Sequence, residues 1–390
     1  MDNIIKCNET LPTSVAVLGS TGSVGRQSLD VARLHHIKVD FLSANRDADE
    51  MERQVREFSP RYCAMADEVA ARDLKARIAD TNTKVFAGDE GILAGLYATD
   101  ASAVVNAILG AAGLRPTLAT IDTGRRLALS NKESLVLAGE IVMHRAREAG
   151  VEIIPVDSEH SAIFQCLAAG RHSEVKRLVL TASGGPFFGR SRKELASVTV
   201  ADALAHPTWK MGAKITVDSA TMMNKGFEVI EAYHLFGVSP ERIKVLVHRE
   251  SIMHSAVEYI DNIVIAQLSI PDMRECVQYA LTYPARMESP TRELDFVSLG
   301  RMTFAEPDTE AFPLLPLAIK CAADGGVRPC VLNAANEIAV AAFLEGKLSF
   351  NGIFDVVSRV VESIPAGENI TINDIFESDL HARALAAELI

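Results

Sequence analysis

Several features are scarce or missing in this 390-residue chain, and each absence excludes a class of protein. No apolar run approaches the roughly 18 residues that a membrane-spanning helix needs. The six cysteines are scattered without metal-type or redox-type spacing, so we expect reduced, mostly buried thiols. Positive charge is in deficit, with a formal net charge of −12, which argues against nucleic acid as a partner. The first residues lack a signal-peptide pattern, so we expect a cytoplasmic protein without membrane association.

What the chain does contain is typical of a globular protein. Hydrophobic residues make up 48% of it and charged residues 23%, a balance that disordered chains lack. A chain of 390 residues is too long for one compact core. We therefore expect two or three domains.

A glycine-rich turn follows the first apolar segment. Residues 14–18 and 39–42 predict strands and residues 26–34 predict a helix, the order of a dinucleotide-binding fold. In the turn, Gly19 permits the tight bend, Gly22 lets backbone approach a pyrophosphate, and Gly25 permits close helix packing. The spacing G-x-x-G-x-x-G could also mark a simple turn, but its position between strand and helix favours a bound nucleotide.

The end of the second predicted strand selects the cofactor. An NAD site usually carries a carboxylate there for the ribose hydroxyls. Here Ala44, Asn45 and Arg46 come first, and no acid stands before Asp47. Asn45 and Arg46 suit a 2′-phosphate, so NADP(H) is favoured. The alternative is that Arg46 is a solvated surface residue.

Two separate segments carry a dense set of polar groups that would be costly to bury without a role. The carboxylates of Asp157, Glu159 and Glu228 are ligands suited to a hard divalent cation. Without a cation, three neighbouring negative charges would repel each other and a phosphorylated substrate. Oxygen ligands alone point to Mg²⁺ or Mn²⁺. Hydroxyl, amide and ammonium groups beside them suit a phosphate, namely Ser158, Ser219, Asn224 and Lys225.

The positions of these groups along the chain support their grouping. Residues 127–129 and 151–156 predict strands that end just before Lys132 and Asp157, where α/β folds bind ligands. Residues 218–236 predict one helix on which Asn224 and Lys225 share a face with Glu228. The alternative is a charged stripe that faces solvent.

Residues 183–213 are rich in glycine and proline and contain the single tryptophan, Trp209. This composition is compatible with a lid that closes over a ligand and equally with a surface loop around a packed tryptophan. Of the histidines, His206 in this segment is the candidate for a substrate contact. His160 and His254 are candidates for supporting groups.

The whole pattern predicts an α/β chain with an N-terminal Rossmann-like dinucleotide-binding domain, an α+β catalytic domain and a C-terminal helical domain. The second domain contains predicted strands at 177–181 and 245–248 and a predicted hairpin over 254–269. We place the domains at 1–157, at 158–283 with the lid at about 183–213, and at 309–390, with a linker at 284–308.

With these motifs in view, the chain closely resembles the 1-deoxy-D-xylulose 5-phosphate reductoisomerases of the non-mevalonate isoprenoid pathway. The resemblance runs over nearly the whole length. The matching blocks are Leu18–Gly25, Ser130–Val136, Pro155–His160, Ser183–Phe187, His206–Gly212, Val217–Gly226, Pro271–Arg274 and Leu332–Glu337.

The resemblance implies the conversion of 1-deoxy-D-xylulose 5-phosphate to 2-C-methyl-D-erythritol 4-phosphate. It implies a carbon-skeleton rearrangement by retro-aldol and aldol steps, followed by reduction with NADPH. It also implies Mg²⁺ or Mn²⁺ as the metal, with Co²⁺ as an alternative, and a homodimer whose second domain carries the dimer interface.

The resemblance further implies roles for individual residues. The metal ligands are Asp157, Glu159 and Glu228, and the closing loop carries Trp209 and Met211. The catalytic residues are Lys132, Glu159, His206 and Glu228, and the substrate contacts are Lys132, Ser158, Ser183, His206, Ser219, Asn224 and Lys225. The cofactor contacts are Ser20, Thr21, Gly22, Ser23, Val24, Ala44, Asn45, Arg46, Asn131, Glu133 and Gly212.

The chain departs from the family pattern in two places. The family often has a basic residue directly after position 44, where this chain has Asn45 and then Arg46. The family's frequent His-Pro-Gln-Ser is His248-Arg249-Glu250-Ser251 here, which bears on local packing or on the dimer edge. Three rival functions stay open on the residues alone: a metal-free dehydrogenase, a metal-dependent sugar-phosphate aldolase or isomerase, and a nucleotide sensor without enzymatic activity.

Overall fold

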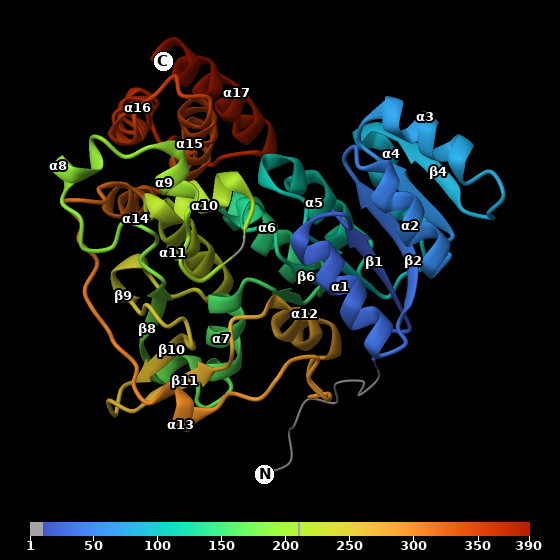
Figure 1. Ribbon diagram of the computed structural model, residues 1–390, viewed down its shortest axis with the longest axis horizontal. Helices are drawn as coiled ribbons and strands as arrows, with labels where there is room; N and C mark the ends of the chain where they lie inside the picture. The colour runs from blue at the N-terminus through green and yellow to red at the C-terminus, as the bar shows by residue number, and fades with distance from the viewer. Residues whose placement is uncertain (1–10, 210) are drawn as a thin grey trace. The chain divides into compact units, whose positions relative to one another are not determined.

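The computed structural model describes residues 11–209 and 211–390 (Figure 1). The N-terminal segment with Cys7, and Lys210 of the predicted lid, lie outside the described residues. The backbone divides into two compact units. The first comprises Met1–Asn131, His144–Ser161 and Asp272–Arg292, and the second comprises Lys132–Met143, Ala162–Pro271 and Glu293–Ile390. Across the residues that are described, none of the helices combines the length and apolarity that crossing a bilayer requires.

The first unit is built on a parallel sheet of seven strands in the order β4-β3-β2-β1-β5-β6-β7. Its central strands are continuous apolar runs, as expected for a parallel sheet covered on both faces. The Rossmann-like prediction is confirmed. The strands are β1 (Ser14–Leu18), β2 (Lys38–Ala44), β3 (Tyr62–Met65), β4 (Lys84–Ala87), β5 (Ala103–Asn106), β6 (Arg126–Leu129) and β7 (Ile153–Pro155).

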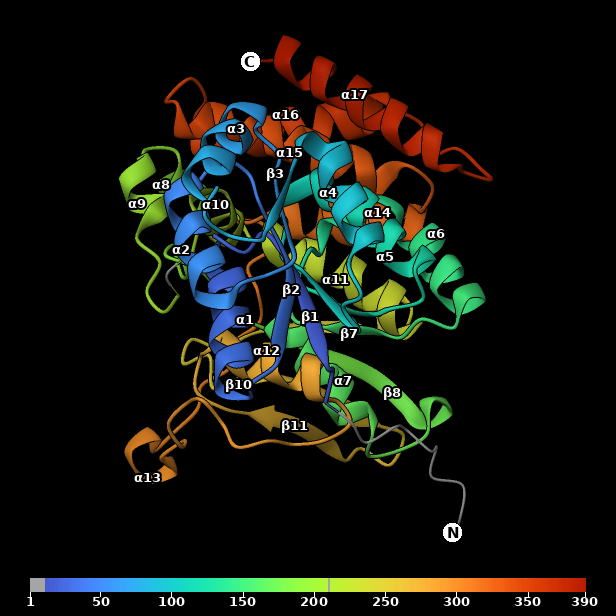
Figure 2. The same ribbon diagram turned by 90° about the vertical axis from the view of Figure 1, so that its right-hand side faces the viewer.

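Helices cover both faces of this sheet. Figure 2 shows α1 and α2 on one side of β1 and β2, with α4 and α5 on the other. Phe41, Leu96 and Val104 meet in the core between strands and helices. The helices are α1 (Ser23–Leu34), α2 (Ala48–Phe58), α3 (Glu68–Arg77), α4 (Gly88–Ala98), α5 (Leu114–Asp122) and α12 (Met273–Thr282), with a 3₁₀ turn η1 (Gly110–Gly113). Helix α12 packs on α1, and His35 hydrogen-bonds Gln278 at 2.7 Å.

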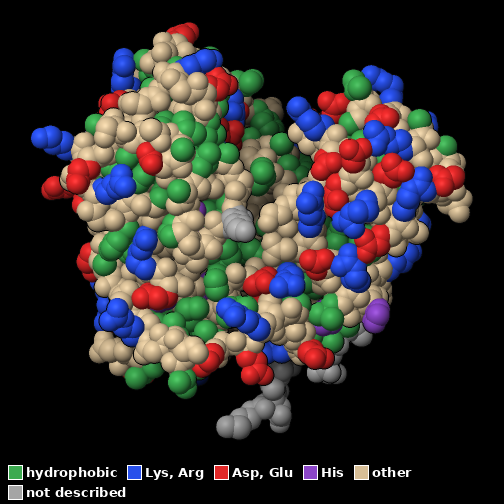
Figure 3. Space-filling view, viewed as in Figure 1, with side chains coloured by type: hydrophobic (Ala, Val, Ile, Leu, Met, Phe, Trp, Pro, Cys, Tyr) green, Lys and Arg blue, Asp and Glu red, His purple; other side chains and the backbone are tan. Residues whose placement is uncertain are grey.

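The outer surface of these helices mixes charges of both signs (Figure 3). Arg33 pairs with Asp30 and Glu57, and Arg56 pairs with Asp80. Exposed pairs of this kind contribute little to stability.

The second unit contains a mixed sheet of four strands in the order β11-β10-β8-β9. Strand β8 (Val175–Ala182) runs parallel to β9 (Ile243–Val247) and antiparallel to β10 (Met253–Tyr259), which forms a hairpin with β11 (Val264–Leu268). Asn262 takes positive φ in the hairpin turn. The predicted α+β character and the hairpin are therefore confirmed.

The rest of this unit is helical (Figure 1). Helix α15 packs against α16 and α17, and α14 packs against α11, as predicted for the C-terminal part of the chain. The helices are α8 (Arg192–Leu195), α9 (Val200–Leu204), α10 (Ala213–Ala220), α11 (Met223–Phe236), α13 (Phe296–Leu299), α14 (Leu314–Asp324), α15 (Arg328–Leu344), α16 (Phe350–Ser363) and α17 (Ile372–Glu388). Two 3₁₀ turns are η2 (His172–Glu174) and η3 (Pro240–Arg242), while α6 (Glu133–Ala149) and α7 (Ser158–Leu167) contribute residues to both units.

The single helix predicted over residues 218–236 is wrong. Helix α10 ends at Ala220 and α11 begins at Met223, because Met222 takes a left-handed conformation with φ of 61°. The hydroxyl oxygen of Thr221 accepts a hydrogen bond from the Met223 N–H at 3.3 Å, which stabilises the break. Ser219 therefore lies on a different helix from Asn224. Helical periodicity could not reveal this, because methionine is a good helix former.

Candidate active site

The glycine turn between β1 and α1 is packed so tightly against backbone atoms that it has no room for side chains at Gly19 and Gly25. Gly19 has φ of +75°, and a Cβ atom on it would stand 2.6 Å from the Ala107 carbonyl oxygen. A Cβ on Gly25 would stand 2.2 Å from the Gly19 carbonyl oxygen. Helix α1 begins at Ser23, three residues earlier than predicted, and its N-cap Gly22 offers no side-chain cap. The first-turn N–H groups thus lack a side-chain cap, an arrangement suited to an anion such as a pyrophosphate.

The residues predicted to select the cofactor stand at the end of β2. Ala44 is buried, whereas Asn45 and Arg46 are exposed. The Asp67 N–H donates to the Asn45 carbonyl at 3.0 Å, which places the start of α3 beside Arg46. Backbone hydrogen bonds from Ala70 and Val69 lower the pKa of the Asp67 carboxyl, and Arg46 lowers it further. Ser20 is fully buried, and its N–H donates to the Ser43 carbonyl at 2.8 Å, joining the turn to β2.

Asn131 lies beyond the end of β6. Its side-chain amide donates to the carbonyls of Ile108 and Gly110, at 2.7 and 2.9 Å. A Cβ on Gly113 would strike this amide at 2.4 Å, so glycine is needed there. Asn131 therefore fixes the segment that follows β5 at the carboxyl edge of the sheet, where ligands of α/β folds bind.

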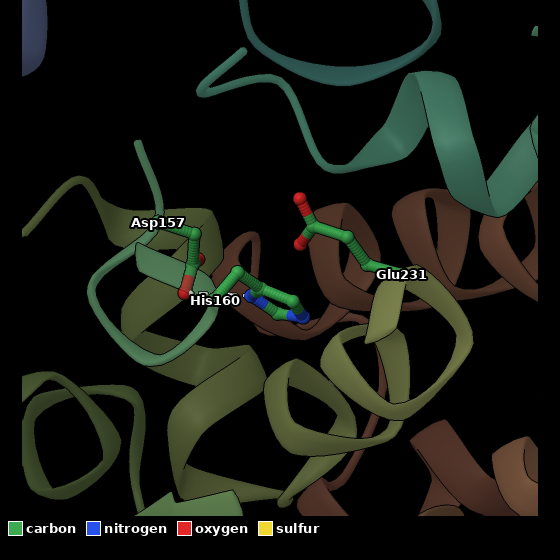
Figure 4. A group of neighbouring side chains, drawn as sticks. All are labelled: Asp157, His160 and Glu231. Carbon is green, nitrogen blue, oxygen red and sulfur yellow. Dashed lines mark hydrogen bonds and ion pairs between the residues drawn. The ribbon is translucent and has the colours of Figure 1, made fainter. Parts of the chain in front are cut away.

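The first two predicted metal ligands stand at the start of α7 in the first unit. Asp157 and Glu159 are half-buried, and an oxygen of Asp157 lies 3.2 Å from Nδ1 of the buried His160 (Figure 4). The Ser158 hydroxyl donates to Glu159 at 2.6 Å. His160 thus orients the Asp157 carboxylate and Ser158 orients that of Glu159, and both carboxylates remain partly accessible. Glu231, also drawn in Figure 4, belongs to α11 of the second unit.

The third predicted ligand, Glu228, is the centre of a buried cluster in the second unit. The side chain of Glu228 is about 2% exposed and that of Lys132 about 8% exposed. Lys132 Nζ lies 3.0 Å from Oε1 of Glu228. Lys225 also pairs with Glu228. Asn224 donates to Glu228 at 2.5 Å and accepts from Lys132 at 3.0 Å. The shared helix face is confirmed, and the solvent-facing stripe is wrong. Two ammonium groups thus flank the Glu228 carboxylate within the second unit.

Ser183 and His206 meet in the predicted lid segment. The Ser183 hydroxyl lies 3.0 Å from His206 Nε2. His206 Nδ1 accepts hydrogen bonds from the N–H groups of Thr208 and Trp209, at 3.2 and 2.9 Å. These bonds assign the proton to Nε2, which donates to Ser183. Burial lowers the pKa of His206, and the positive charge of Arg249 lowers it further. The ring is therefore neutral at neutral pH.

The lid segment contains the short helices α8 and α9 and then leads into α10, whose N-cap is Gly212. Trp209 is half-buried, with its ring centre 6.4 Å from that of His254. Burial lowers the pKa of His254 to about 4, which marks it as a neutral structural histidine. Ser219 is partly exposed, and a Cβ on Gly185 would lie 2.7 Å from its carbonyl oxygen. The Ser183 turn and α10 are therefore in direct contact.

Sequence reasoning missed a polar network that supports α10. Lys214 pairs with Asp218 at 2.8 Å and lies 3.5 Å from Glu133, and Asn336 donates to Asp218 at 2.8 Å. Burial opposes the charge of Lys214, but Asp218 and then Glu133 outweigh it and raise its pKa. The spacing of Lys214 and Asp218, four residues apart, was the available signal. Glu133, predicted as a cofactor contact, is buried in this network.

Comparison with known proteins agrees with this geometry. Three family models match, described as 1-deoxy-D-xylulose 5-phosphate reductoisomerase over residues 15–139, as its C-terminal domain over 153–236, and as DXP reductoisomerase C-terminal domain over 268–385. The 1-deoxy-D-xylulose 5-phosphate reductoisomerase of Acetivibrio thermocellus is 50% identical, covering 96% of this chain and 99% of its own length. That of Geobacillus kaustophilus is 48% identical, with coverages of 96% and 99%.

Two solved structures of the same enzyme are also similar to this chain. The Zymomonas mobilis reductoisomerase in complex with NADPH has a TM-score of 0.91 and 43% identity, covering 97% of this chain and 99% of that one. A reductoisomerase in complex with NADPH, fosmidomycin and magnesium has a TM-score of 0.91 and 38% identity, with coverages of 97% and 98%. The chain therefore belongs to the 1-deoxy-D-xylulose 5-phosphate reductoisomerase family, the NADPH- and metal-dependent oxidoreductases of isoprenoid biosynthesis.

Proposed function

We propose that this chain converts 1-deoxy-D-xylulose 5-phosphate to 2-C-methyl-D-erythritol 4-phosphate, by retro-aldol and aldol steps followed by reduction. The observation that carries the proposal is the buried cluster of Glu228 with Lys132, Asn224 and Lys225. The carboxylate suits a divalent cation, and the two ammonium groups and the amide suit a phosphorylated substrate. Burying such a set costs free energy that a structural role alone would not require.

The proposed metal ligands are Asp157, Glu159 and Glu228, with Mg²⁺ or Mn²⁺ as the ion and Co²⁺ as an alternative. Their donors are all carboxylate oxygens, which fits a hard divalent cation. Magnesium in the solved structures of relatives supports the choice. When bound, the cation supplies Lewis-acid polarisation of the substrate's ketone and neighbouring hydroxyl, and NADPH supplies the hydride.

The substrate is proposed to lie between two sets of side chains. The phosphate would bind Ser183, Ser219, Asn224 and Lys225, while Lys132, Ser158 and His206 would contact the sugar backbone. Lys132, Glu159, His206 and Glu228 are the proposed catalytic residues. His206 can act as a neutral hydrogen-bond donor through Nε2, because both N–H groups of the following turn donate to its Nδ1. Grip on the phosphate, remote from the reacting carbons, can orient those carbons and close the lid over 183–213 with Trp209 and Met211.

The NADPH site is proposed at the glycine turn and the end of β2. The closed turn of Gly19 and Gly25 and the uncapped start of α1 support it, as does NADPH in the solved relatives. The 2′-phosphate would be read by Asn45 and Arg46. The remaining contacts are proposed at Ser20, Thr21, Gly22, Ser23, Val24, Ala44, Asn131, Glu133 and Gly212.

One assay tests the proposed reaction against its rivals. NADPH oxidation is followed with the deoxyxylulose phosphate, with and without Mg²⁺ or Mn²⁺, and the product is identified by mass spectrometry. We expect the methylerythritol phosphate only when both metal and NADPH are present. Activity that survives a chelator would support a metal-free dehydrogenase, and rearrangement to a stable product without NADPH would support an aldolase or isomerase. Absence of any product would support a nucleotide sensor.

A homodimer is proposed on the edge of the four-stranded sheet. Strand β11 lies at the edge of the sheet, and the side chains of Ile263, Val264 and Ile265 at its start are exposed. Phe296 and Val297 of the predicted linker are exposed as well. An exposed apolar edge strand invites pairing unless something covers it. Sedimentation equilibrium should give twice the chain mass, and a monomer at micromolar concentration would refute the dimer.

We place the enzyme in the cytoplasm, consistent with five free cysteines among the described residues, and fractionation of cells tests this.

A further inference from the structure

Arg249 occupies the position at which the sequence departs from the family's frequent His-Pro-Gln-Ser. It stands in the turn between β9 and β10, next to the buried His248. His248 Nε2 accepts hydrogen bonds from the N–H groups of Ile252 and Met253, both at 3.2 Å. These bonds fix the backbone of the turn from which the Arg249 side chain extends.

From this base, Arg249 reaches the Ser183 turn. One nitrogen, Nη1, donates to the carbonyl oxygens of Ser183 and Gly185, at 3.0 and 2.6 Å. The centre of the guanidinium lies 5.2 Å from the ring centre of Phe188. One side chain thus contacts both ends of the Ser183–Gly185 turn and the ring of Phe188, three residues beyond it.

This turn needs external support because of its backbone. Gly184 and Gly185 both have positive φ, 76° and 62°, and two successive glycines lose much conformational freedom on ordering. Within the turn, the Gly185 N–H donates to the Ser183 hydroxyl at a long 3.3 Å. A charged donor to two carbonyls is a stronger constraint than that bond.

The Ser183 hydroxyl is also the hydrogen-bond partner of His206. A shift of the turn would therefore move Ser183 relative to His206 and relative to Ser219, whose carbonyl packs on Gly185. Arg249 is also the charged group whose field acts on the His206 ring.

We propose that Arg249 is a positioning residue for the phosphorylated substrate. Its side chain holds the Ser183–Gly185 turn in place, so that the Ser183 hydroxyl and His206 face the substrate together. The proposal rests on the proposed function, which puts Ser183 and His206 in the substrate site.

The test compares Arg249→Met and Arg249→Lys with Glu250→Gln as the matched control. Glu250 lies in the same turn but accepts hydrogen bonds from the N–H and hydroxyl of Thr303, at 3.2 and 2.7 Å, instead of contacting the Ser183 turn. In Arg249→Met we expect KM for the sugar phosphate to rise about tenfold, the effect of losing about one charged hydrogen bond, with KM for NADPH unchanged. Guanidinium at low concentration should restore part of the loss, and lysine should give an intermediate KM.

A readout independent of activity is the titration of His206 by NMR. Removal of Arg249 should raise the pKa of His206, while Glu250→Gln should leave it unchanged. If Ser183→Ala has normal KM but the His206 pKa still responds to Arg249, the contact is real and the proposed substrate site is wrong. If the pKa of His206 and KM are both unchanged in folded Arg249→Met, the positioning role is overturned. Should that variant not fold, an unchanged KM in Arg249→Lys would overturn it equally.

Discussion

The glycine turn of the first unit and the Glu228 cluster of the second, the two proposed anion sites, are built by opposite means. In the turn, the donors are backbone N–H groups, and the essential residues are those without a side chain, Gly19 and Gly25. In the cluster, the donors and acceptors are side chains from α11 and from Lys132, just before α6. The turn works because nothing projects into it. The cluster instead depends on buried charges of opposite sign that lie next to one another.

The difference has a consequence for how each region tolerates change. A backbone site fails through steric overlap, whatever the chemistry of the new side chain. A site of buried charges fails through imbalance, even when the new side chain has the same shape. The two can therefore be separated by substitutions that alter only shape or only charge.

The largest expected effect comes from a change of charge alone, Glu228→Gln. Glutamine has nearly the shape of glutamate, but Lys132 and Lys225 would lose their counter-charge and the proposed metal would lose a ligand. We expect kcat to fall by about 10²–10³ at saturating substrate, the size of loss typical when a key electrostatic group is removed. Steady-state NADPH oxidation across a range of Mn²⁺ concentrations measures it.

Glu231→Gln is the matched control for this prediction. It makes the same chemical change on the same helix, and Glu231 is likewise buried but is not among the proposed ligands. We expect a smaller loss of kcat. Near-normal turnover of Glu228→Gln at high metal, or equal losses in both variants, would remove Glu228 from the ligand set.

A change of shape alone tests the other region, and we expect a smaller effect from it. Gly25→Ala places a methyl group 2.2 Å from the Gly19 carbonyl oxygen, so the backbone must shift. We expect the free energy of unfolding to fall by about 1–3 kcal/mol, as in other overpacked sites, and NADPH affinity to fall at least about tenfold. Denaturant titration and calorimetry measure the two quantities.

Gly22→Ala serves as the comparison, because its methyl group would stand 3.2 Å from the same oxygen. We expect a smaller loss of stability than in Gly25→Ala, while NADPH affinity should still fall because Gly22 is itself a proposed cofactor contact. If Gly25→Ala bound NADPH as the original protein does, the turn would not be the pyrophosphate site.

The two regions also differ in how far the sequence alone could predict them. The turn is local, so the order of strand, glycines and helix predicted it, and only the start of α1 was misplaced. Strand β1 was predicted with its bounds, because a buried parallel strand is a continuous apolar run between turn residues. The face shared by Asn224, Lys225 and Glu228 was also local, since it depends only on helical spacing.

What depended on contacts between distant segments could not be predicted from the sequence. The break at Met222 depends on a single left-handed residue among good helix formers. Arg249 stood out only as a departure from the family pattern, and its bonds to the Ser183 turn span more than sixty positions. The pairing of Lys132 with Glu228 spans 96 positions. No residue period encodes such contacts, because tertiary packing alone brings the partners together.

The smallest expected effect comes from Arg46→Ala, which tests the edge of the backbone site at which a side chain takes over. Arg46 is exposed beside the start of α3, so its charge is partly screened by water. We expect NADPH affinity to fall about tenfold and NADH affinity to stay unchanged, because only NADPH carries the 2′-phosphate. Arg72→Ala is the control, since Arg72 also acts on the Asp67 carboxyl but is not proposed to contact the cofactor. Equal losses for both cofactors would make Arg46 a solvated surface residue. Equal losses of NADPH affinity in Arg46→Ala and Arg72→Ala would show that Arg46 acts only through its general positive charge and does not bind the 2′-phosphate specifically.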